Sequence, residues 1–105
     1  MRFLVKVSIP VEAGNKAACE GTLGKKVQDI LGKLKPEAAY FTEMNGQRTG
    51  ILIVQMDQTS KIPSIAEPWF LGFNAAVEFH PVMLSADLEK ASSDIAQSVQ
   101  AFAAV

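Results

Sequence analysis

The sequence has few of the residues from which covalent cross-links and metal sites are built. It contains one cysteine, Cys19, and one histidine, His80, among 105 residues. A single cysteine excludes an intramolecular disulfide and a multi-cysteine metal site within one chain. The acidic residues are scattered along the chain, so we expect no metal site, and no motif calls for a cofactor.

An excess of charge of one sign and a long apolar run are also missing. Lys and Arg total 10 against 11 Asp and Glu, a net charge of -1, so no basic field favours nucleic acid or an anionic membrane as a partner. Apolar runs such as Gly50–Val54 fall far short of the roughly 20 residues that span a membrane. The first ten residues lack the apolar centre of a signal peptide. We therefore expect a soluble, cytoplasmic protein.

Apolar residues are plentiful instead, at 49% of the chain. The length predicts one compact domain over residues 1–105. A domain of this size buries about two thirds of the surface that its unfolded chain exposes. The apolar surplus therefore predicts either a rich core or an interface with another molecule.

Alternation of apolar and polar residues predicts a strand over residues 2–9, which ends at Pro10. Asn45–Gly46 is a strong hairpin signal, because both residues tolerate a positive φ. The remaining predicted strands cover residues 38–44, 49–56 and 76–83, and Pro81 marks an edge position or the end of the last one.

Apolar residues at helical spacing predict three helical segments. The second half of residues 11–35 is amphipathic, and glycines with a possible N-cap at Thr22 predict a break before it. A second helix is expected to start near Ser60, and Pro68 is expected to kink or end it near Glu67. A single last helix is predicted from Ser85 to Phe102.

This order of elements predicts an α+β fold, the ferredoxin-like β-α-β-β-α-β arrangement with a C-terminal helix. We expect a four-stranded antiparallel sheet of order 4-1-3-2. From the handedness of crossover connections we also expect one exception, namely that the neighbouring first and third strands run parallel. Both main helices then cover one face of the sheet.

The other face of the sheet is predicted to be open. Alternation places Leu4, Lys6 and Ser8 there, with Ala76, Glu78, His80 and Val82 of the last strand. The third strand is apolar on both sides, which is typical of a strand buried on both faces. A second copy of the chain is the simplest cover, so a homodimer is expected.

In pattern, the opening MRFLVKVSIP, the Asn-Gly hairpin and the closing EFHPVM strand resemble the dimeric α+β barrel superfamily. Its small members include muconolactone isomerases, antibiotic-biosynthesis monooxygenases and YCII-like proteins. The resemblance spans nearly the whole chain and implies a homodimer whose sheets pack face to face, with a pocket between sheet and helices in each subunit. The monooxygenases use an asparagine, a tryptophan and a histidine together, and Asn74, Trp69 and His80 do not match that pattern by position.

One candidate catalytic group is His80 with Glu78 and Lys6. Strand alternation places them close together, and a carboxylate and an ammonium beside an imidazole suit acid–base chemistry. The alternative is a structural polar network at an interface or an exposed rim.

A candidate ligand pocket is formed by Tyr40, Trp69, Phe70 and Phe73, which suit a flat apolar ligand. The alternative is that a stripe of aromatic residues at helical spacing belongs to the core.

Gly21–Lys26 resembles a phosphate loop but lacks the first glycine of that motif and its final Ser or Thr. The start of the helix near Thr22 is then the remaining candidate site for a small anion. Cys19 has no histidine nearby in the sequence.

Three functions follow from these features. The first is a homodimer that binds a small, mostly apolar or aromatic ligand between sheet and helices. The second is an isomerase or cofactor-free monooxygenase that uses His80 as acid or base, and the third is a structural or regulatory dimer without a ligand. The fold alone does not distinguish them.

Overall fold

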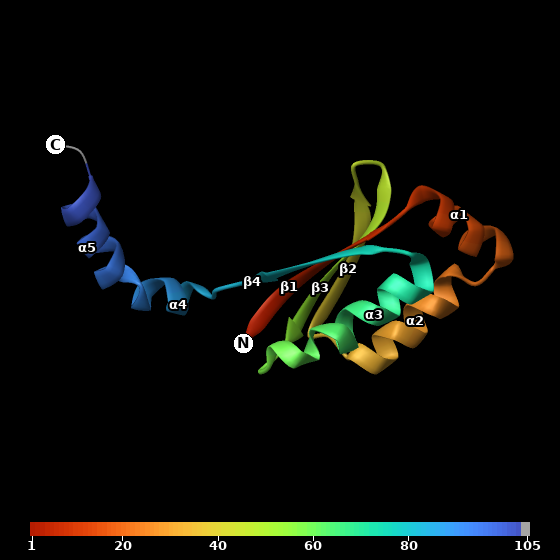
Figure 1. Ribbon diagram of the computed structural model, residues 1–105, viewed down its shortest axis with the longest axis horizontal. Helices are drawn as coiled ribbons and strands as arrows, with labels where there is room; N and C mark the ends of the chain where they lie inside the picture. Colours follow the sequence, from red (N-terminus) through yellow and green to blue (C-terminus); the bar gives the residue numbers. More distant parts are fainter. Residues whose placement is uncertain (104–105) are drawn as a thin grey trace.

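A computed structural model of the chain describes residues 1–103. Four strands form one sheet, and α1, α2 and α3 lie beside it (Figure 1). In chain order the elements are β1 (Arg2–Ile9), α1 (Val11–Glu20), α2 (Leu23–Leu34), β2 (Ala38–Met44), β3 (Gln47–Gln55), a short 3-10 helix (Thr59–Lys61), α3 (Ile62–Phe73), β4 (Ala76–Pro81), α4 (Ser85–Lys90) and α5 (Ser92–Phe102).

The sheet has the order β2-β3-β1-β4, which confirms the predicted ferredoxin-like α+β fold. All three neighbouring pairs are antiparallel, including β1 with β3. The expectation that the first and third strands run parallel was therefore wrong. The crossover through α1 and α2 makes β1 and β2 run in the same direction, and the hairpin then reverses β3 against both.

The hairpin between β2 and β3 turns at the predicted dipeptide. Asn45 has φ 55° and Gly46 has φ 74°, the pair of positive values that a two-residue turn of this hand requires. The register is regular from Met44 opposite Gln47 to Ala38 opposite Ile53. The turn residues therefore set which side chains of β3 face the helices.

The predicted break between the first two helices is also present. Gly21 ends α1 in the left-handed conformation at φ 74°, and α2 begins after Thr22. In α1, Gly14 lies against β3, because a Cβ at that position would meet Nη1 of Arg48 at 2.6 Å. The same Arg48 atom donates a hydrogen bond to Oδ1 of Asn15 at 3.0 Å, which attaches α1 to the sheet.

Pro68 does not end α3 at Glu67, which was one of the two outcomes predicted from the sequence. The helix continues from Ile62 to Phe73. A proline inside a helix costs about 3 kcal/mol because it lacks the N–H donor and crowds the preceding turn. Ile65 before the proline and Trp69 after it are both buried against the core, and this packing on both sides of Pro68 holds the helix through it.

The core lies between the sheet and the helices. Val5 and Val7 of β1 and Leu52 of β3 have no exposed surface, and Trp69 of α3 packs with them. Phe3, Val77 and Phe79 pack against this cluster on the helix-covered face. Alternation then leaves Leu4, Lys6, Ile51 and Ile53 on the opposite face, which no helix of the described residues covers.

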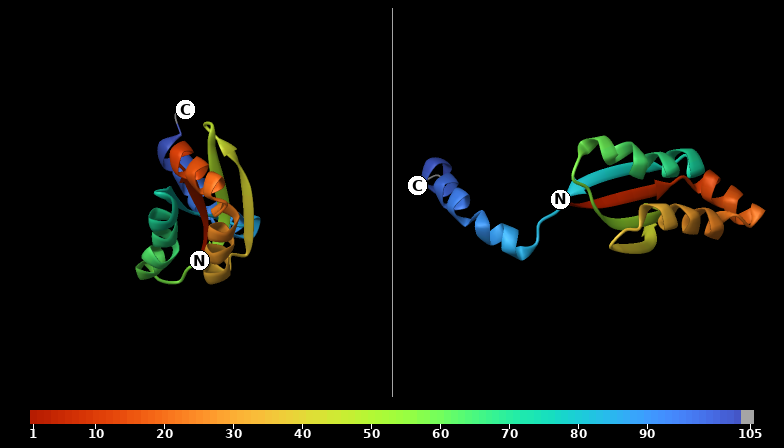
Figure 2. Two further views of the ribbon diagram at one scale, coloured as in Figure 1. Left: turned by 90° about the vertical axis from the view of Figure 1, so that its right-hand side faces the viewer. Right: turned by 90° about the horizontal axis from the view of Figure 1, so that it is seen from below.

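The C-terminal segment, α4 and α5, projects away from the sheet as an arm (Figures 1 and 2). The prediction of a single helix from Ser85 to Phe102 was wrong, because two helices are present and Ala91 separates them. Neither helix has a buried residue. The radius of gyration is 17.9 Å, whereas a compact chain of this length has about 13 Å.

Within residues 1–103, no helix has the length and apolar character needed to cross a membrane.

Two leucines test this description of the core. We expect Leu52→Ala to lower the free energy of unfolding by about 2–5 kcal/mol, because its side chain is fully buried. Leu71→Ala is the matched control, since Leu71 is 83% exposed, and its effect should stay within about 0.5 kcal/mol. Urea unfolding followed by tryptophan fluorescence measures both, and similar losses for the two variants would contradict the assigned core.

Candidate functional site

A groove of about 980 Å³ lies between α2 and α3, beside the end of β3. Ligand pockets usually measure about 300–1,000 Å³. The groove is therefore large enough for a small organic molecule. The apolar residues that line it come from both helices and from β3 and the residue after it: Ile30, Leu34, Val54, Met56, Ile65, Pro68 and Leu71.

The two helices α2 and α3 contact each other near the C-terminus of α3. The Cα of Gly72 in α3 carries no side chain, and a Cβ there would lie 3.7 Å from Cδ1 of Ile30 in α2. At the same end, Lys26 donates a hydrogen bond from Nζ to the Gly72 carbonyl at 3.3 Å and lies 5.6 Å from the centre of the Phe73 ring. The groove lies towards the C-terminus of α2 and the N-terminus of α3.

Charged side chains are confined to the rim of this groove. Lys33, Lys35 and Lys61 line it together with four carboxylates. Two of the carboxylates are already paired, because Lys25 Nζ lies 2.9 Å from Asp29 Oδ2 and Arg2 pairs with Glu37. The hydrogen bond from Lys25 and the charge of Asp29 raise the pKa of the Lys25 ammonium. An apolar floor with a charged rim suits a ligand with an apolar body and a polar end.

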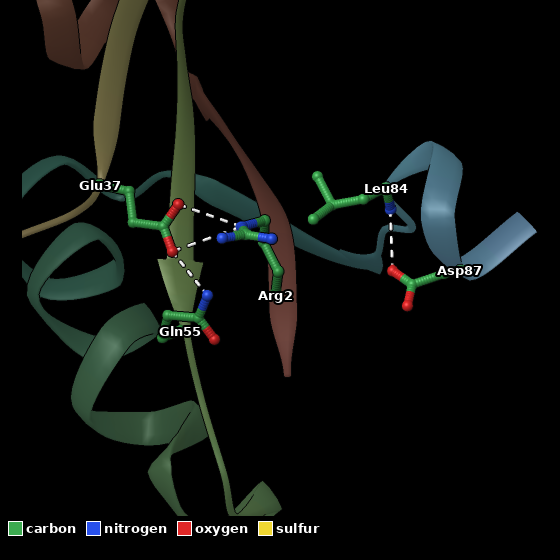
Figure 3. A network of polar contacts seen from close by, with 5 residues as sticks. All are labelled: Arg2, Glu37, Gln55, Leu84 and Asp87. Atoms are coloured by element: carbon green, nitrogen blue, oxygen red, sulfur yellow. Dashed lines mark hydrogen bonds and ion pairs between the residues drawn. The ribbon is translucent and has the colours of Figure 1, made fainter.

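Glu37 forms the centre of a polar network at one end of the sheet (Figure 3). Nε of Arg2 donates to Oε2 of Glu37 at 3.0 Å, and Nε2 of Gln55 donates to Oε1 at 2.6 Å. These hydrogen bonds, from Arg2 first and Gln55 second, hold the pKa of Glu37 below its ordinary value of 4.5. The network joins β1 and β3 to the residue that precedes β2.

The structure places His80, Glu78 and Lys6 together on the open face of the sheet. Glu78 lies between the other two, with His80 Nε2 3.4 Å from Oε1 and Lys6 Nζ 3.6 Å from Oε2. The side chains of His80 and Glu78 are about half exposed, at 56% and 52%. None of the three lines the groove between the helices, so this cluster and the groove lie on opposite faces of the sheet.

The four aromatic residues proposed as a ligand pocket are not brought together. Trp69 and Phe73 stack with ring centres 6.2 Å apart inside the core. Phe70 is 41% exposed on α3, and Tyr40 is 66% exposed on β2, where its register opposite Ile51 places it on the open face. Trp69 Nε1 is buried without a hydrogen-bond partner, an arrangement that costs about 1–3 kcal/mol.

Sequence reasoning did not identify the residues of the groove. Val54, Met56 and Ile65 follow the same apolar spacing as the rest of the core, and only the separation of α2 from α3 leaves them at its edge. One feature of the sequence that could have indicated the groove is Met56 followed by Asp57. An apolar residue directly before a charged loop marks the edge of a core. Methionine is also common in adaptable binding surfaces.

The remaining sequence candidates are Cys19 and Thr22. Cys19 is exposed. The hydroxyl of Thr22 donates to the Ala17 carbonyl at 3.3 Å, so it does not cap the start of α2. In the described part of the chain, no three His, Cys, Asp or Glu side chains are grouped so that they could hold a metal ion.

Comparison of the chain with models of known protein families finds no match, and comparison with curated protein sequences finds no significantly similar relative. The fold and the geometry described above are therefore the basis for a functional assignment.

The Glu37 network predicts a specific pH dependence. A carboxyl group with a lowered pKa stabilises the fold above its unfolded pKa, and this contribution is lost as the pH falls through the folded value. We expect Arg2→Gln to raise the pKa of Glu37 towards 4.5, measured by NMR titration of the side-chain carboxyl carbon. Lys25→Gln removes a cation that pairs with Asp29 instead and should leave the titration of Glu37 unchanged. An unchanged Glu37 titration in Arg2→Gln would contradict the network.

Proposed function

We propose that the chain is a homodimeric binding protein for a small, mostly apolar ligand, which lies in the groove between α2 and α3. The observation that carries this proposal is the groove itself, with about 980 Å³ of space. Its floor is formed by Val54, Met56 and Ile65, all of which are at least nine-tenths buried. Burial of apolar ligand surface against such a floor supplies affinity, and the charged rim orients a polar end.

The homodimer is supported by β3. Leu52 and Val54 face the core, while Ile51 and Ile53 remain half-buried on the open face. Apolar side chains on both faces are typical of a strand that is covered on both sides. The ferredoxin-like topology and this open face also support membership of the dimeric α+β barrel superfamily, which we propose on these grounds.

A second candidate function is acid–base catalysis by His80, as in a cofactor-free isomerase or monooxygenase. Its support is the cluster of Lys6, Glu78 and His80, in which one carboxylate contacts both basic groups. General acid–base catalysis requires a substrate within hydrogen-bond reach of the imidazole. The exposed position of His80 and its separation from the groove favour ligand binding over catalysis.

A neutral fluorescent probe, N-phenyl-1-naphthylamine, tests ligand binding. We expect saturable binding that Leu71→Asp weakens about tenfold, because Leu71 lines the groove and a bound probe covers its side chain, which is 83% exposed without one. Val11→Asp is the control, since Val11 is an exposed apolar residue outside the groove. His80→Ala should also leave binding unchanged.

Several outcomes would overturn this proposal. Equal weakening by Val11→Asp and Leu71→Asp would show that the probe binds exposed apolar surface in general. Absence of saturable binding would favour the dimer without a ligand. Loss of binding in His80→Ala would move the site to the open face and favour the catalytic candidate.

Light scattering at micromolar concentration tests the homodimer. We expect a mass of about twice the 11.3 kDa of one chain, because a monomer leaves Ile51 and Ile53 partly exposed to water. A mass of one chain across the micromolar range would contradict the dimer. Ligand binding in the groove would then still be tested separately by the fluorescent probe.

A further inference from the structure

Three lysines gather at one end of the groove between α2 and α3. Lys33 lies in the last turn of α2, Lys35 follows directly after that helix, and Lys61 directly precedes α3. All three line the groove. The hydrogen bond from Lys26, near the start of α2, to Gly72, near the end of α3, shows that the helices are antiparallel, as Figure 1 also shows. The end of α2 therefore lies beside the start of α3, and the lysines come from both walls of the groove.

The carboxylates that line the groove do not neutralise these lysines. None of the three lysines forms an ion pair with a carboxylate of residues 1–103. Asp29 is taken up by Lys25, whose Nζ lies 2.9 Å from Oδ2. Glu37 accepts hydrogen bonds from Arg2 at 3.0 Å and from Gln55 at 2.6 Å. Neither Lys25 nor Arg2 lines the groove, so two of the four carboxylates are paired with basic groups outside it.

Two carboxylates remain on the rim, those of Asp57 and Glu67. Neither is in an ion pair within the described part of the chain. The three lysines thus outnumber the remaining carboxylates, and they lie together at the end where α2 stops and α3 starts. This end of the groove has an excess of positive charge.

One of the lysines occupies a position that destabilises a helix. The N-terminus of a helix carries a partial positive charge, which favours acidic residues and disfavours basic ones. Lys61 stands at this end of α3, where neither the 3-10 helix before it nor the first turn contains an acidic residue. Lys33 and Lys35 are favourable at the C-terminus of α2 for the same reason. The position of Lys61 is therefore the one that the stability of the helices does not explain.

The opposite end of the groove is apolar. Leu71 lines it near the end of α3, and Ile30 of α2 lies on the other wall. Along the helix, the ten-residue step from Lys61 to Leu71 rises about 15 Å. An extended decyl chain with a head group is of this length. The groove thus has a cationic end and an apolar end that one amphipathic molecule can contact together.

We propose that the ligand of the groove is an amphipathic anion, whose carboxylate or phosphate lies among Lys33, Lys35 and Lys61 and whose apolar body lies along the floor. This inference rests on the proposed ligand-binding function and names the chemical class of the ligand. Lysine binds carboxylates and phosphates as a point charge on a flexible stem. An anion beside Lys61 also offsets the unfavourable position of this lysine at the start of α3.

The exposure of the three lysines sets the size of the expected effect. Exposed ion pairs contribute little individually and are weakened by salt. The apolar floor must therefore supply most of the affinity, as in the proposed function. The lysines act on selectivity, so we expect a preference for an anionic head group over a neutral one of about tenfold.

Calorimetric titration of the full chain with four decyl compounds tests the charge of the head group. Decanoate, decyl phosphate, decan-1-ol and decyltrimethylammonium share one apolar chain and differ in the head group. We expect the two anions to bind about tenfold more tightly than the alcohol and the cation to bind more weakly than the alcohol. The tighter anion distinguishes a carboxylate from a phosphate ligand. Raising the ionic strength from about 0.01 M to about 1 M should remove most of the advantage of the anions, because the Debye length falls from about 30 Å to about 3 Å.

A paired substitution tests the lysines themselves. Lys33→Gln with Lys61→Gln removes one cation from each wall of the groove. It should bring decanoate down to the affinity of decan-1-ol and leave decan-1-ol unchanged. Lys16→Gln with Lys90→Gln is the matched control, since both side chains are exposed and lie outside the groove. This control should change the affinity for decanoate by less than about twofold, because distant exposed charges are screened.

A charge reversal keeps the test decisive if the paired substitution lowers stability. Lys33→Glu with Lys61→Glu should make decyltrimethylammonium bind more tightly than decanoate. Partial unfolding weakens both compounds and cannot exchange their order. The near-ultraviolet circular dichroism of Trp69, which is fully buried, reports that the core remains folded in each variant.

The outcomes separate this inference from the proposed function. Equal affinities of the parent chain for decanoate and decan-1-ol would overturn the anionic ligand and leave the apolar groove in place. A preference for decanoate that persists in Lys33→Gln with Lys61→Gln would also overturn it, because the head group would then lie elsewhere. Binding of N-phenyl-1-naphthylamine without binding of any decyl compound would overturn this inference alone. Absence of binding by the probe and by all four decyl compounds would overturn both.

Discussion

The structure depends on the pairing of β1 with β3 at the centre of the sheet, where β3 is apolar on both faces. Leu52 and Val54 enter the core, and Ile51 and Ile53 face the other way. Alternate residues of a strand point to opposite faces, so one layer of helices covers only half of these side chains. The layer of helices on one face and the open face on the other both follow from this constraint.

On the covered face, the way in which α2 and α3 meet decides what the surface can bind. Contact at Gly72 and Ile30 closes one end of the helix pair, and the hydrogen bond from Lys26 to the Gly72 carbonyl adds to it. The other end stays apart and exposes the edge of the core as a groove. A groove of this kind lies at the edge of the core, which explains why apolar residues of the core line it together with charged residues of the surface.

On the open face, two groups of paired charges lie beside the apolar side chains of Leu4, Ile51 and Ile53. Glu78 holds Lys6 and His80 on one side, and Glu37 holds Arg2 at the strand ends. Exposed ion pairs of this type contribute little to stability.

Local patterns in the sequence were sufficient for much of the fold. The alternation in β1, the positive φ values at Asn45–Gly46 and the break at Gly21 depend on neighbouring residues, and each was predicted correctly. The prediction at Pro68 allowed a kink or an end, and the helix does not end there, because packing of Ile65 and Trp69 outweighs the local cost of the proline. The prediction of one final helix failed at Ala91, where no sequence signal marks a break.

The candidate site shows the same division. Strand alternation alone brought Lys6, Glu78 and His80 together, whereas the aromatic residues grouped by their spacing were separated into core and surface. The sequence by itself determined the order of the strands and which face of each strand is apolar, because both follow from periodicity and turns. Only the tertiary structure decided where α2 and α3 separate and where the arm points, because these depend on contacts between segments far apart in the chain.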